Sequence, residues 1–348
     1  MEIISRKKPS YPVSKGFRKF LKRYGREVSI PVSYDFLRHF QHSRPIFDKD
    51  GNDTLWETVM YNPTIQDEIN RHLKHVYSLL KASGNPSAEE HLHIERIDYC
   101  LFGNSNPFRI KIVNNYNEVY DYFYIKKADA SRIIGLELEH LVSPYWINYL
   151  VDHNTLVEEH ISGVPGDVFI KNYLHRPEFN AKRIAKEFVK FNERCFFRLL
   201  GDMRSYNFVF DITQDFDDIQ FRIRAIDFDQ QFYEGRKNMY LPQFFKENKI
   251  FVDLVLEHCH PDVIRQYQLE ERAQIIKRIK AQRVRLKELK EAVENDELST
   301  SEKITQLSEE LCGYFGKDEF RKCDTMGRLI DLHMRCIIAE NQKPSRHR

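Results

Sequence analysis

The stretch of sequence that decides the fold is Leu200-Gly201-Asp202-Met203-Arg204-Ser205-Tyr206-Asn207-Phe208-Val209-Phe210. It is followed, twenty residues after Asn207, by Ile226-Asp227-Phe228-Asp229. The residues from 208 and those before 226 are typical of two strands of a hairpin, so we expect Asp202, Asn207 and Asp227 to converge at one strand end. Carboxylate and amide oxygens suit Mg²⁺, which otherwise keeps water and phosphate oxygens. The cation Arg204 is placed to neutralise charge on a transferring phosphoryl group.

This pattern resembles the catalytic core of the protein-kinase-like superfamily, particularly its aminoglycoside and choline phosphotransferase branch, whose loop reads H-G-D-x-H-x-x-N. The resemblance implies that Asp202 is the base that orients the acceptor hydroxyl, and that Asn207 and Asp227 are the metal ligands. Two positions depart from the pattern. Leu200 replaces the usual His, and Asp229 stands where protein kinases have the Gly of D-F-G. Neither departure removes a reacting group.

Upstream, the turn Leu101-Phe102-Gly103-Asn104-Ser105-Asn106 separates two predicted strands. It is similar to the phosphate loop of the small-molecule branch, which reads G-x-x-N and is followed by a strand. The resemblance implies that the backbone N–H groups of Gly103, Asn104, Ser105 and Asn106 face the nucleotide phosphates. Without the resemblance, the Gly and Asn residues of this segment would indicate only an ordinary turn.

The following strand looks like the one that bears the phosphate-binding lysine of the family. Alternation places Tyr124 and Lys126 on one face of this strand and Lys127 on the other. We assign Lys126 because Tyr124 would then stack on adenine, and Lys127 would be a solvated neighbour. The next helix offers Glu137 and Glu139 as partners for the lysine, and Glu137 is preferred because it flanks the buried face.

A further strand, Leu156-Val157-Glu158-Glu159-His160-Ile161-Ser162-Gly163, is similar to the family's hinge, which ends in E-x-h-x-G. The resemblance implies backbone contacts to adenine from Glu159 and Ile161. Five elements thus occur in family order over about residues 98–230, roughly two-fifths of the chain. The first 90 residues and the region after 240 match no family pattern.

The predicted fold is α+β, a two-lobed protein-kinase-like fold with a small antiparallel sheet, a mostly helical C-lobe and an N-terminal helical extension. We expect a basic helical extension over residues 1–90, a nucleotide-binding N-lobe over 91–162 and a catalytic, acceptor-binding C-lobe over 163–348. Periodicity predicts helices near 15–24, 64–84 and 129–142, strands between 93 and 127, a strand pair near 147–161, and a polar turn at 48–53.

Composition excludes several classes of protein. The chain has 348 residues, of which 41% are hydrophobic and 13% aromatic, enough for two cores. No apolar run is long enough for a membrane span, and no apolar segment follows the charged N-terminus as in a secretory signal. Lys and Arg number 54 against 52 Asp and Glu, so no overall charge favours nucleic acid. Six cysteines without a C-x-x-C predict free thiols and a cytoplasmic protein.

The function predicted from the sequence is ATP- and Mg²⁺-dependent transfer of the γ-phosphoryl group to a hydroxyl of a small molecule, sugar, lipid headgroup or protein. A basic arm over residues 1–28 suits an acidic acceptor or is simply solvated. Two alternatives stay open, which are a catalytically silent kinase fold that serves as a binding module and a kinase-fold enzyme that transfers AMP. The basic segment 264–293 either binds a protein partner as a coiled coil or packs on the body of the protein.

Overall fold

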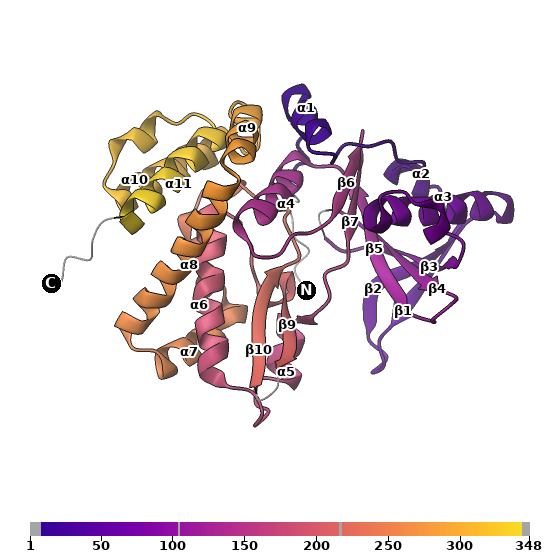
Figure 1. The fold of residues 1–348 in the computed structure, drawn as a ribbon, viewed down its shortest axis with the longest axis horizontal. Helices are drawn as coiled ribbons and strands as arrows, with labels where there is room; N and C mark the ends of the chain where they lie inside the picture. Colours follow the sequence, from indigo (N-terminus) through magenta and orange to yellow (C-terminus); the bar gives the residue numbers. More distant parts are fainter. Residues whose placement is uncertain (1–7, 104, 216–217, 343–348) are drawn as a thin grey trace. The chain divides into compact units, whose positions relative to one another are not determined.

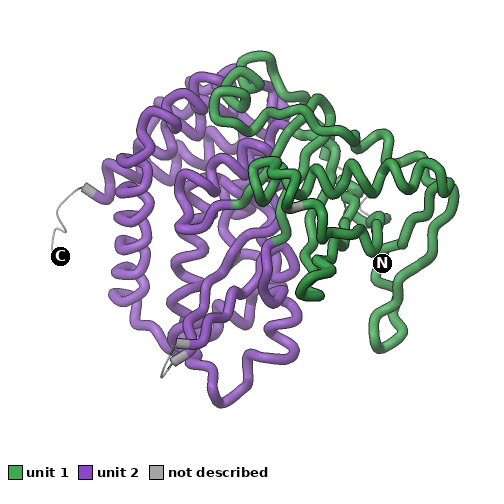
Figure 2. Tube along the Cα trace, turned by 45° about the vertical axis from the view of Figure 1, so that its right-hand side comes forward, with its two compact units in different colours: residues 1–129, 147–160 green, residues 130–146, 161–348 purple. Residues whose placement is uncertain are grey.

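The computed structural model describes residues 8–103, 105–215 and 218–342. The chain separates into two compact units (Figure 2). Unit 1 comprises Met1–Asp129 with Ile147–His160, and unit 2 comprises Ala130–Trp146 with Ile161–Arg348. The predicted division into three domains at residues 90 and 162 stays a prediction. The two units are described one at a time.

Unit 1 is built on a seven-stranded antiparallel sheet with the strand order β1-β2-β3-β4-β5-β7-β6 (Figure 1). The strands are β1 (His42–Phe47), β2 (Asp53–Met60), β3 (Leu92–Cys100), β4 (Phe108–Asn114), β5 (Tyr120–Lys127), β6 (Tyr149–Asp152) and β7 (Thr155–Glu159). The helical elements of this unit are α1 (Lys15–Arg23), α2 (Tyr34–Leu37), α3 (Pro63–Ala82) and the short 3₁₀ turn η1 (Pro86–Ala88).

Helix α3 supplies much of the core of unit 1. Asn62 caps its first turn by accepting a hydrogen bond from the Thr64 amide, and Pro63 occupies the first helical position, where its missing N–H costs nothing. Ile69, Leu73 and Val76 lie on one face and are fully buried. They join one apolar cluster with Phe108, Ile110, Phe123 and Ile125 of strands β4 and β5. The helix predicted near 64–84 is thereby confirmed.

The first 90 residues contain more than the predicted helices. The polar turn at 48–53 is present, and Asp48 accepts hydrogen bonds from the backbone amides of Asp50 and Asn52. On either side of it the chain forms β1 and β2, and β2 pairs with β3. The extension therefore lengthens the sheet, because Trp56 and Cys100 lie opposite each other in the ladder.

Unit 2 is mostly helical and includes a three-stranded sheet with the order β10-β9-β8. Its strands are β8 (Val164–Pro165), β9 (Phe208–Asp215) and β10 (Asp218–Ala225). Its α-helices are α4 (Ala130–Val142), α5 (Gly166–Asn172), α6 (Ala181–Arg198), α7 (Lys249–His258), α8 (Pro261–Ala281), α9 (Arg283–Val293), α10 (Ser301–Phe315) and α11 (Met326–Gln342). Its 3₁₀ turns are η2 (Ser205–Asn207), η3 (Lys237–Tyr240), η4 (Pro242–Phe244), η5 (Lys246–Asn248) and η6 (Asp318–Lys322).

Helix α4 is joined to the rest of unit 2 by arginine–carboxylate pairs. Glu139 pairs with Arg198 at the end of α6, and both side chains are almost fully buried. Glu137, which is 0% exposed, binds the guanidinium of Arg285 on α9 through both carboxylate oxygens at 2.8 Å. Bidentate pairs of this kind fix orientation as well as distance. Helix α4 thus belongs with the helices of unit 2.

The basic segment 264–293 forms two helices that pack on unit 2. Gln282 ends α8 and precedes α9, so the helix is interrupted at this residue. The three apolar residues at seven-residue spacing, Ile279, Leu286 and Val293, are all buried. Their burial favours packing on the body over a free coiled-coil face.

The predicted α+β class is confirmed, since antiparallel sheet dominates the N-terminal part and helices dominate the C-terminal part. The predicted helices at 15–24 and 129–142 and the strand pair near 147–161 are present as α1, α4, β6 and β7. Among the described residues, none of the helices is both long and apolar enough to cross a membrane.

Candidate active site

The loop that carries Asp202 leaves helix α6 through a tight left-handed turn. Leu199 caps the helix with φ 50°, and Asp202 itself has φ 56°, a conformation that costs energy for a residue with a side chain. Hydrogen bonds to its backbone hold Asp202 there, among them one of 2.8 Å from the Arg204 amide to the Asp202 carbonyl. The Asp202 amide donates to the Met239 carbonyl at 3.2 Å, and the Asp202 carbonyl accepts from Nδ2 of Asn207 at 2.7 Å. The loop is therefore held in a strained geometry, as is common at functional sites.

The carboxylate of Asp202 is partly shielded and bound to a cation. Arg204 Nε donates to it at 2.7 Å, and the same guanidinium binds Glu247 at 2.9 Å. Burial raises the pKa of Asp202, and Glu234 and Glu247 add to this rise, while Arg204 opposes it. A carboxylate with a raised pKa is a better proton acceptor than an ordinary surface aspartate.

The hairpin of β9 and β10 brings Asn207 and Asp227 to the same end. Phe208 and Ala225 are the last register pair of the two strands, and the Ile226 amide donates to the Asn207 carbonyl at 3.0 Å. Asn207 and Asp227 therefore both lie just beyond this end of the hairpin. The convergence of their side chains on a metal stays a prediction.

The residues after β10 connect this end of the hairpin to helix α4. The Asp229 amide donates to Asp227 Oδ1 at 2.9 Å. The Asp229 carboxylate, only 5% exposed, pairs with Arg132 of α4. Between the two aspartates, Phe228 packs against Gly135, where an added methyl group would lie 2.9 Å from Phe228 Cβ. Asp229 thus serves to anchor the loop, and Asp227 is the carboxylate at the hairpin end.

The residues at the hairpin end fit a magnesium ion that brings most of its own ligands. Asn207 uses its amide nitrogen for the bond to Asp202, so its amide oxygen is the atom suited to a metal. Within residues 8–103, 105–215 and 218–342, no group of three or more His, Cys, Asp or Glu residues is placed to hold a metal. One carboxylate and one amide match Mg²⁺ bound with phosphate and water oxygens, rather than an all-protein cage.

In unit 1, Lys126 has a partner that the sequence analysis did not identify. Its ammonium lies 2.7 Å from Oε2 of Glu158 on the neighbouring strand β7, and the two residues are 8% and 4% exposed. Lys127 is exposed, as expected of a solvated neighbour. Alternation in residues 156–159 places Glu158 on one face of β7, and this was the signal in the sequence for a partner on the neighbouring strand.

The predicted partner of Lys126, Glu137, is engaged elsewhere. It pairs with Arg285, and the alternative Glu139 pairs with Arg198. Both acids are buried in unit 2, where an uncompensated carboxylate is costly, so each has an arginine partner there. The structure thus gives Glu137 and Lys126 separate partners, which corrects the predicted pairing.

Tyr124 lies on the same face of β5 as Lys126. Its ring centre is 5.8 Å from the Lys126 ammonium, and its hydroxyl lies 3.2 Å from Nδ1 of His160. Burial raises the pKa of Tyr124 to about 12 and lowers the pKa of His160. The expected stacking of Tyr124 on adenine stays a prediction.

The turn between β3 and β4 has the conformation of a glycine turn. Gly103 has φ 95°, and the Tyr34 hydroxyl donates to the carbonyls of Ser105 and Asn106 at 3.3 and 3.0 Å. Asn104 lies outside the described residues. The turn is therefore anchored to α2 through Tyr34, and its role in binding phosphates stays a prediction.

The predicted hinge residues occupy the end of β7 and the start of unit 2. The Glu159 carboxylate accepts from the Asn148 amide at 2.7 Å and from Lys81 at 2.9 Å, so its side chain serves the fold of unit 1. Ile161, 9% exposed, is the first residue of the second segment of unit 2. Backbone contacts from Glu159 and Ile161 to adenine stay a prediction.

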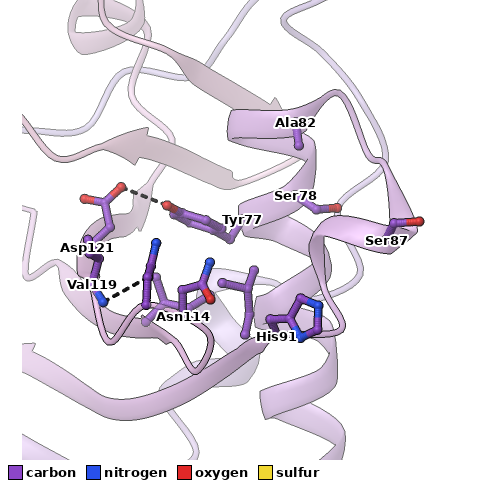
Figure 3. Close-up of a pocket in the computed structure, with 11 residues that line it drawn as sticks. Tyr77, Ser78, Ala82, Ser87, His91, Asn114, Val119 and Asp121 are labelled. Carbon is purple, nitrogen blue, oxygen red and sulfur yellow. Dashed lines mark hydrogen bonds between the residues drawn. The ribbon is translucent and has the colours of Figure 1, made fainter.

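A hollow of about 320 Å³ in unit 1 lies among α3, η1, β3 and the β4–β5 hairpin (Figure 3). Its polar groups already serve the fold. Tyr77 donates to Asp121 at 3.0 Å (Figure 3). The backbone amide of Asn114 donates to the Val119 carbonyl at 2.9 Å. It contains none of the residues that the sequence predicts for the site.

No family model matches the chain, and no curated protein matches its sequence. Among solved structures, the chain is similar to the proinflammatory kinase CtkA of Helicobacter pylori, at 10% sequence identity and a TM-score of 0.37, covering 67% of this chain and 94% of that one. It is also similar to titin kinase with its flanking domains, at 12% identity and a TM-score of 0.26, covering 70% of this chain and 46% of that one. Both are structures of kinases, and the agreement is weak in sequence and in coordinates.

Proposed function

We propose that the protein is an ATP- and Mg²⁺-dependent phosphotransferase of kinase-like fold that moves the γ-phosphoryl group to a hydroxyl. The observation that carries the proposal is the joining of Asp202, Asn207 and Asp227 by one loop and one hairpin. Asn207 donates to the Asp202 carbonyl, and the Asn207 carbonyl accepts from the amide of Ile226, the residue before Asp227. This order of base, amide and second carboxylate is the one by which the sequence resembles the aminoglycoside and choline phosphotransferases.

In this mechanism the protein positions groups and balances charge. Bound Mg²⁺ supplies neutralisation of the phosphate oxygens, and Asn207 and Asp227 would hold it. Asp202 accepts the proton of the acceptor hydroxyl as its oxygen bonds to phosphorus and the bond to the ADP oxygen breaks. Arg204, which binds the Asp202 carboxylate at 2.7 Å, keeps that carboxylate ionised and adds positive charge beside the transferred group. Lys126 binds the phosphates of the nucleotide.

The acceptor we propose is a small hydroxyl-bearing molecule with an anionic group. A hollow of about 260 Å³ in unit 2 is lined by Lys237, Gln268, Arg272, Phe244 and Tyr314, among others. The Lys237 ammonium lies 4.4 Å from the centre of the Tyr314 ring, and Phe244 is 56% exposed at the edge. Glu193 also lines the hollow and accepts from Arg272 Nε at 2.6 Å, so the positive charge of Arg272 is balanced there. The Lys237 ammonium, the Gln268 amide and the aromatic rings together suit a polar ring or chain that carries a carboxylate or phosphate.

The segment that forms one wall of this hollow is bonded to the catalytic loop. The Met239 carbonyl accepts from the Asp202 amide, and Asn248 Nδ2 donates to the Met203 carbonyl at 2.8 Å. A ligand in the hollow would therefore contact the same segment that holds Asp202 in place. This supports the hollow as part of the acceptor site.

The test is incubation of the purified full-length chain with labelled ATP, Mg²⁺ and a pool of small metabolites. We expect transfer of label that is lost in Asp202→Ala and Asp227→Ala and kept in Asp253→Ala, whose exposed side chain pairs with Lys249. Mass spectrometry of the product separates phosphoryl from AMP transfer. If the wild type binds no nucleotide with Mg²⁺ in a thermal-shift titration, the proposal is wrong and a silent binding module is favoured.

A further inference from the structure

The pair of Lys126 and Glu158 joins two neighbouring strands on one face of the sheet. Lys126 lies opposite Leu156 in the β5–β7 ladder, and Tyr124 lies opposite Glu158. Glu158 is therefore two residues along the ladder from the position directly opposite Lys126, a diagonal that long side chains can span. The ammonium and Oε2 meet at 2.7 Å, and both residues are more than nine-tenths buried.

Stability alone does not account for this buried pair. Removing an ammonium and a carboxylate from water costs roughly several kcal/mol per ion. Apolar residues of similar size can often replace such a buried pair without loss of folding stability. Glu158 Oε1 is buried and has no hydrogen-bond partner among the described residues. Among the described residues the two buried charged groups share one hydrogen bond, a weak arrangement for stability that points to another role.

The acidic residues of helix α4 have arginine partners in unit 2. Glu137 binds Arg285 with both oxygens, and Glu139 pairs with Arg198. Breaking either pair to serve a lysine would leave a buried guanidinium behind. Glu158 is the carboxylate that the structure places in contact with Lys126 within unit 1.

We propose that Glu158 is the positioning residue for Lys126, in place of a glutamate on the helix that follows the lysine strand. The inference rests on the proposed phosphotransferase function. Glu158 holds the ammonium on the face of β5 that carries Tyr124, so that the nucleotide phosphates meet a cation in a fixed position. It acts through Lys126 and touches no reacting atom.

The test compares the affinity for Mg²⁺·ATP with the affinity for adenosine, both by calorimetry, because only ATP needs the cation. We expect Glu158→Gln to weaken ATP binding by about tenfold to a hundredfold, the range for a lost hydrogen bond to a charged group, with adenosine affinity unchanged within twofold. Glu158→Asp should recover part of the loss. The matched control is Glu95→Gln, which removes an exposed cross-strand partner of Lys111 at 2.8 Å and should change neither affinity.

A second variant separates positioning from folding. In the double variant Lys126→Met with Glu158→Leu, two apolar side chains replace the pair. We expect its melting temperature to lie within a few degrees of that of the wild type. We also expect the double variant to bind adenosine and to lose binding of ATP. The proposal is overturned if Glu158→Gln weakens ATP and adenosine equally, or if Glu137→Gln rather than Glu158→Gln gives the ATP-selective loss. A wild-type chain that binds neither ligand would instead overturn the phosphotransferase function on which the inference rests.

Discussion

The side chain of Asn207 donates a hydrogen bond of 2.7 Å from Nδ2 to the backbone carbonyl of Asp202. This contact joins the residue proposed as the base to a residue proposed as a metal ligand. It also supports a backbone that is strained, since Asp202 has φ 56°. In this proposal Asn207 has two roles. Its side-chain nitrogen donates a hydrogen bond to the loop, and its side-chain oxygen binds the metal ion, so substitutions that remove one atom or both can separate the two roles.

Replacing Asn207 tests the two purposes. Asn207→Leu removes donor and oxygen, so kcat should fall at least about a hundredfold, as for a lost active-site donor, and half-saturation should need more Mg²⁺. Asn207→Asp loses the donor and keeps an oxygen, so kcat should fall without a greater need for Mg²⁺. Initial rates against Mg²⁺ concentration measure both. Asn172→Leu, exposed at the end of α5, is the control, and equal Mg²⁺ dependence in Asn207→Leu and the wild type would contradict the metal assignment.

The pH dependence should report the environment of Asp202. Burial raises the pKa of this carboxyl above the ordinary 3.8, so the rate should fall as pH decreases with a midpoint above that value. Arg204 lowers the same pKa, so Arg204→Met should move the midpoint to higher pH. The measurement is kcat/KM against pH for both proteins. A midpoint that moves to lower pH in Arg204→Met would contradict the assignment.

The ionised carboxylate of Asp202 should be needed for activity and should lower the stability of the fold. Because folding raises its pKa, the ionised carboxylate costs stability at neutral pH, and this cost disappears as pH falls through the folded pKa toward 3.8. Asp202→Asn should therefore abolish transfer while the melting temperature at pH 7 stays equal or rises. The difference in melting temperature should vanish in acid. A lower melting temperature at pH 7 would mean that the ion pair with Arg204 outweighs burial.

The pair of Glu137 and Arg285 should be important for the stability of unit 2. Glu137 is 0% exposed, so Arg285→Met leaves a buried carboxylate without its cation and should destabilise the fold by about 3 kcal/mol. Adding Glu137→Leu to that variant should recover most of the loss, because no charge is then buried. Urea unfolding of the two single variants and the double variant measures the coupling. A coupling below about 0.5 kcal/mol would show that the pair is not formed in solution.

Two helical glycines offer a matched comparison. A methyl group at Gly135 in α4 would lie 2.9 Å from Phe228 Cβ and 3.3 Å from Gln231 Cβ, whereas one at Gly313 in α10 meets no atom within 4 Å. Gly135→Ala should destabilise the protein by about 1–3 kcal/mol through overpacking and should displace the loop that carries Asp227. Gly313→Ala should stabilise it by about 0.5–1 kcal/mol through helix propensity. Equal effects would argue against close packing of α4 on this loop.

Much of the fold follows from local patterns in the chain. The period of 3.6 in residues 64–84 predicts α3, and alternation predicts β3, β4 and β5. Strands β1 and β2 were not predicted, because their residues alternate poorly, and pairing of β2 with β3 depends on partners about 40 residues away. Nonlocal pairing of this kind leaves no periodic signal in one strand.

The candidate site divides in the same way. The bond between Asn207 and the Asp202 carbonyl and the placement of Asn207 and Asp227 at one end of the hairpin follow from the chain, because a short loop and a hairpin are local structures. The partner of Lys126 does not follow from spacing, since Glu137 and Glu158 are both acids on elements that succeed it. Which acid pairs with the lysine depends on which arginines are near.

The sequence by itself determined the α+β class, helix α3, the strands β3, β4 and β5, and the residue types suited to phosphates and Mg²⁺. Only the tertiary structure decided the ion pairs, with Glu137 bound to Arg285, Glu139 to Arg198 and Lys126 to Glu158. The physical reason is desolvation. A buried charge must have a counter-charge within hydrogen-bond distance, and that partner is chosen by packing across elements rather than by distance along the chain.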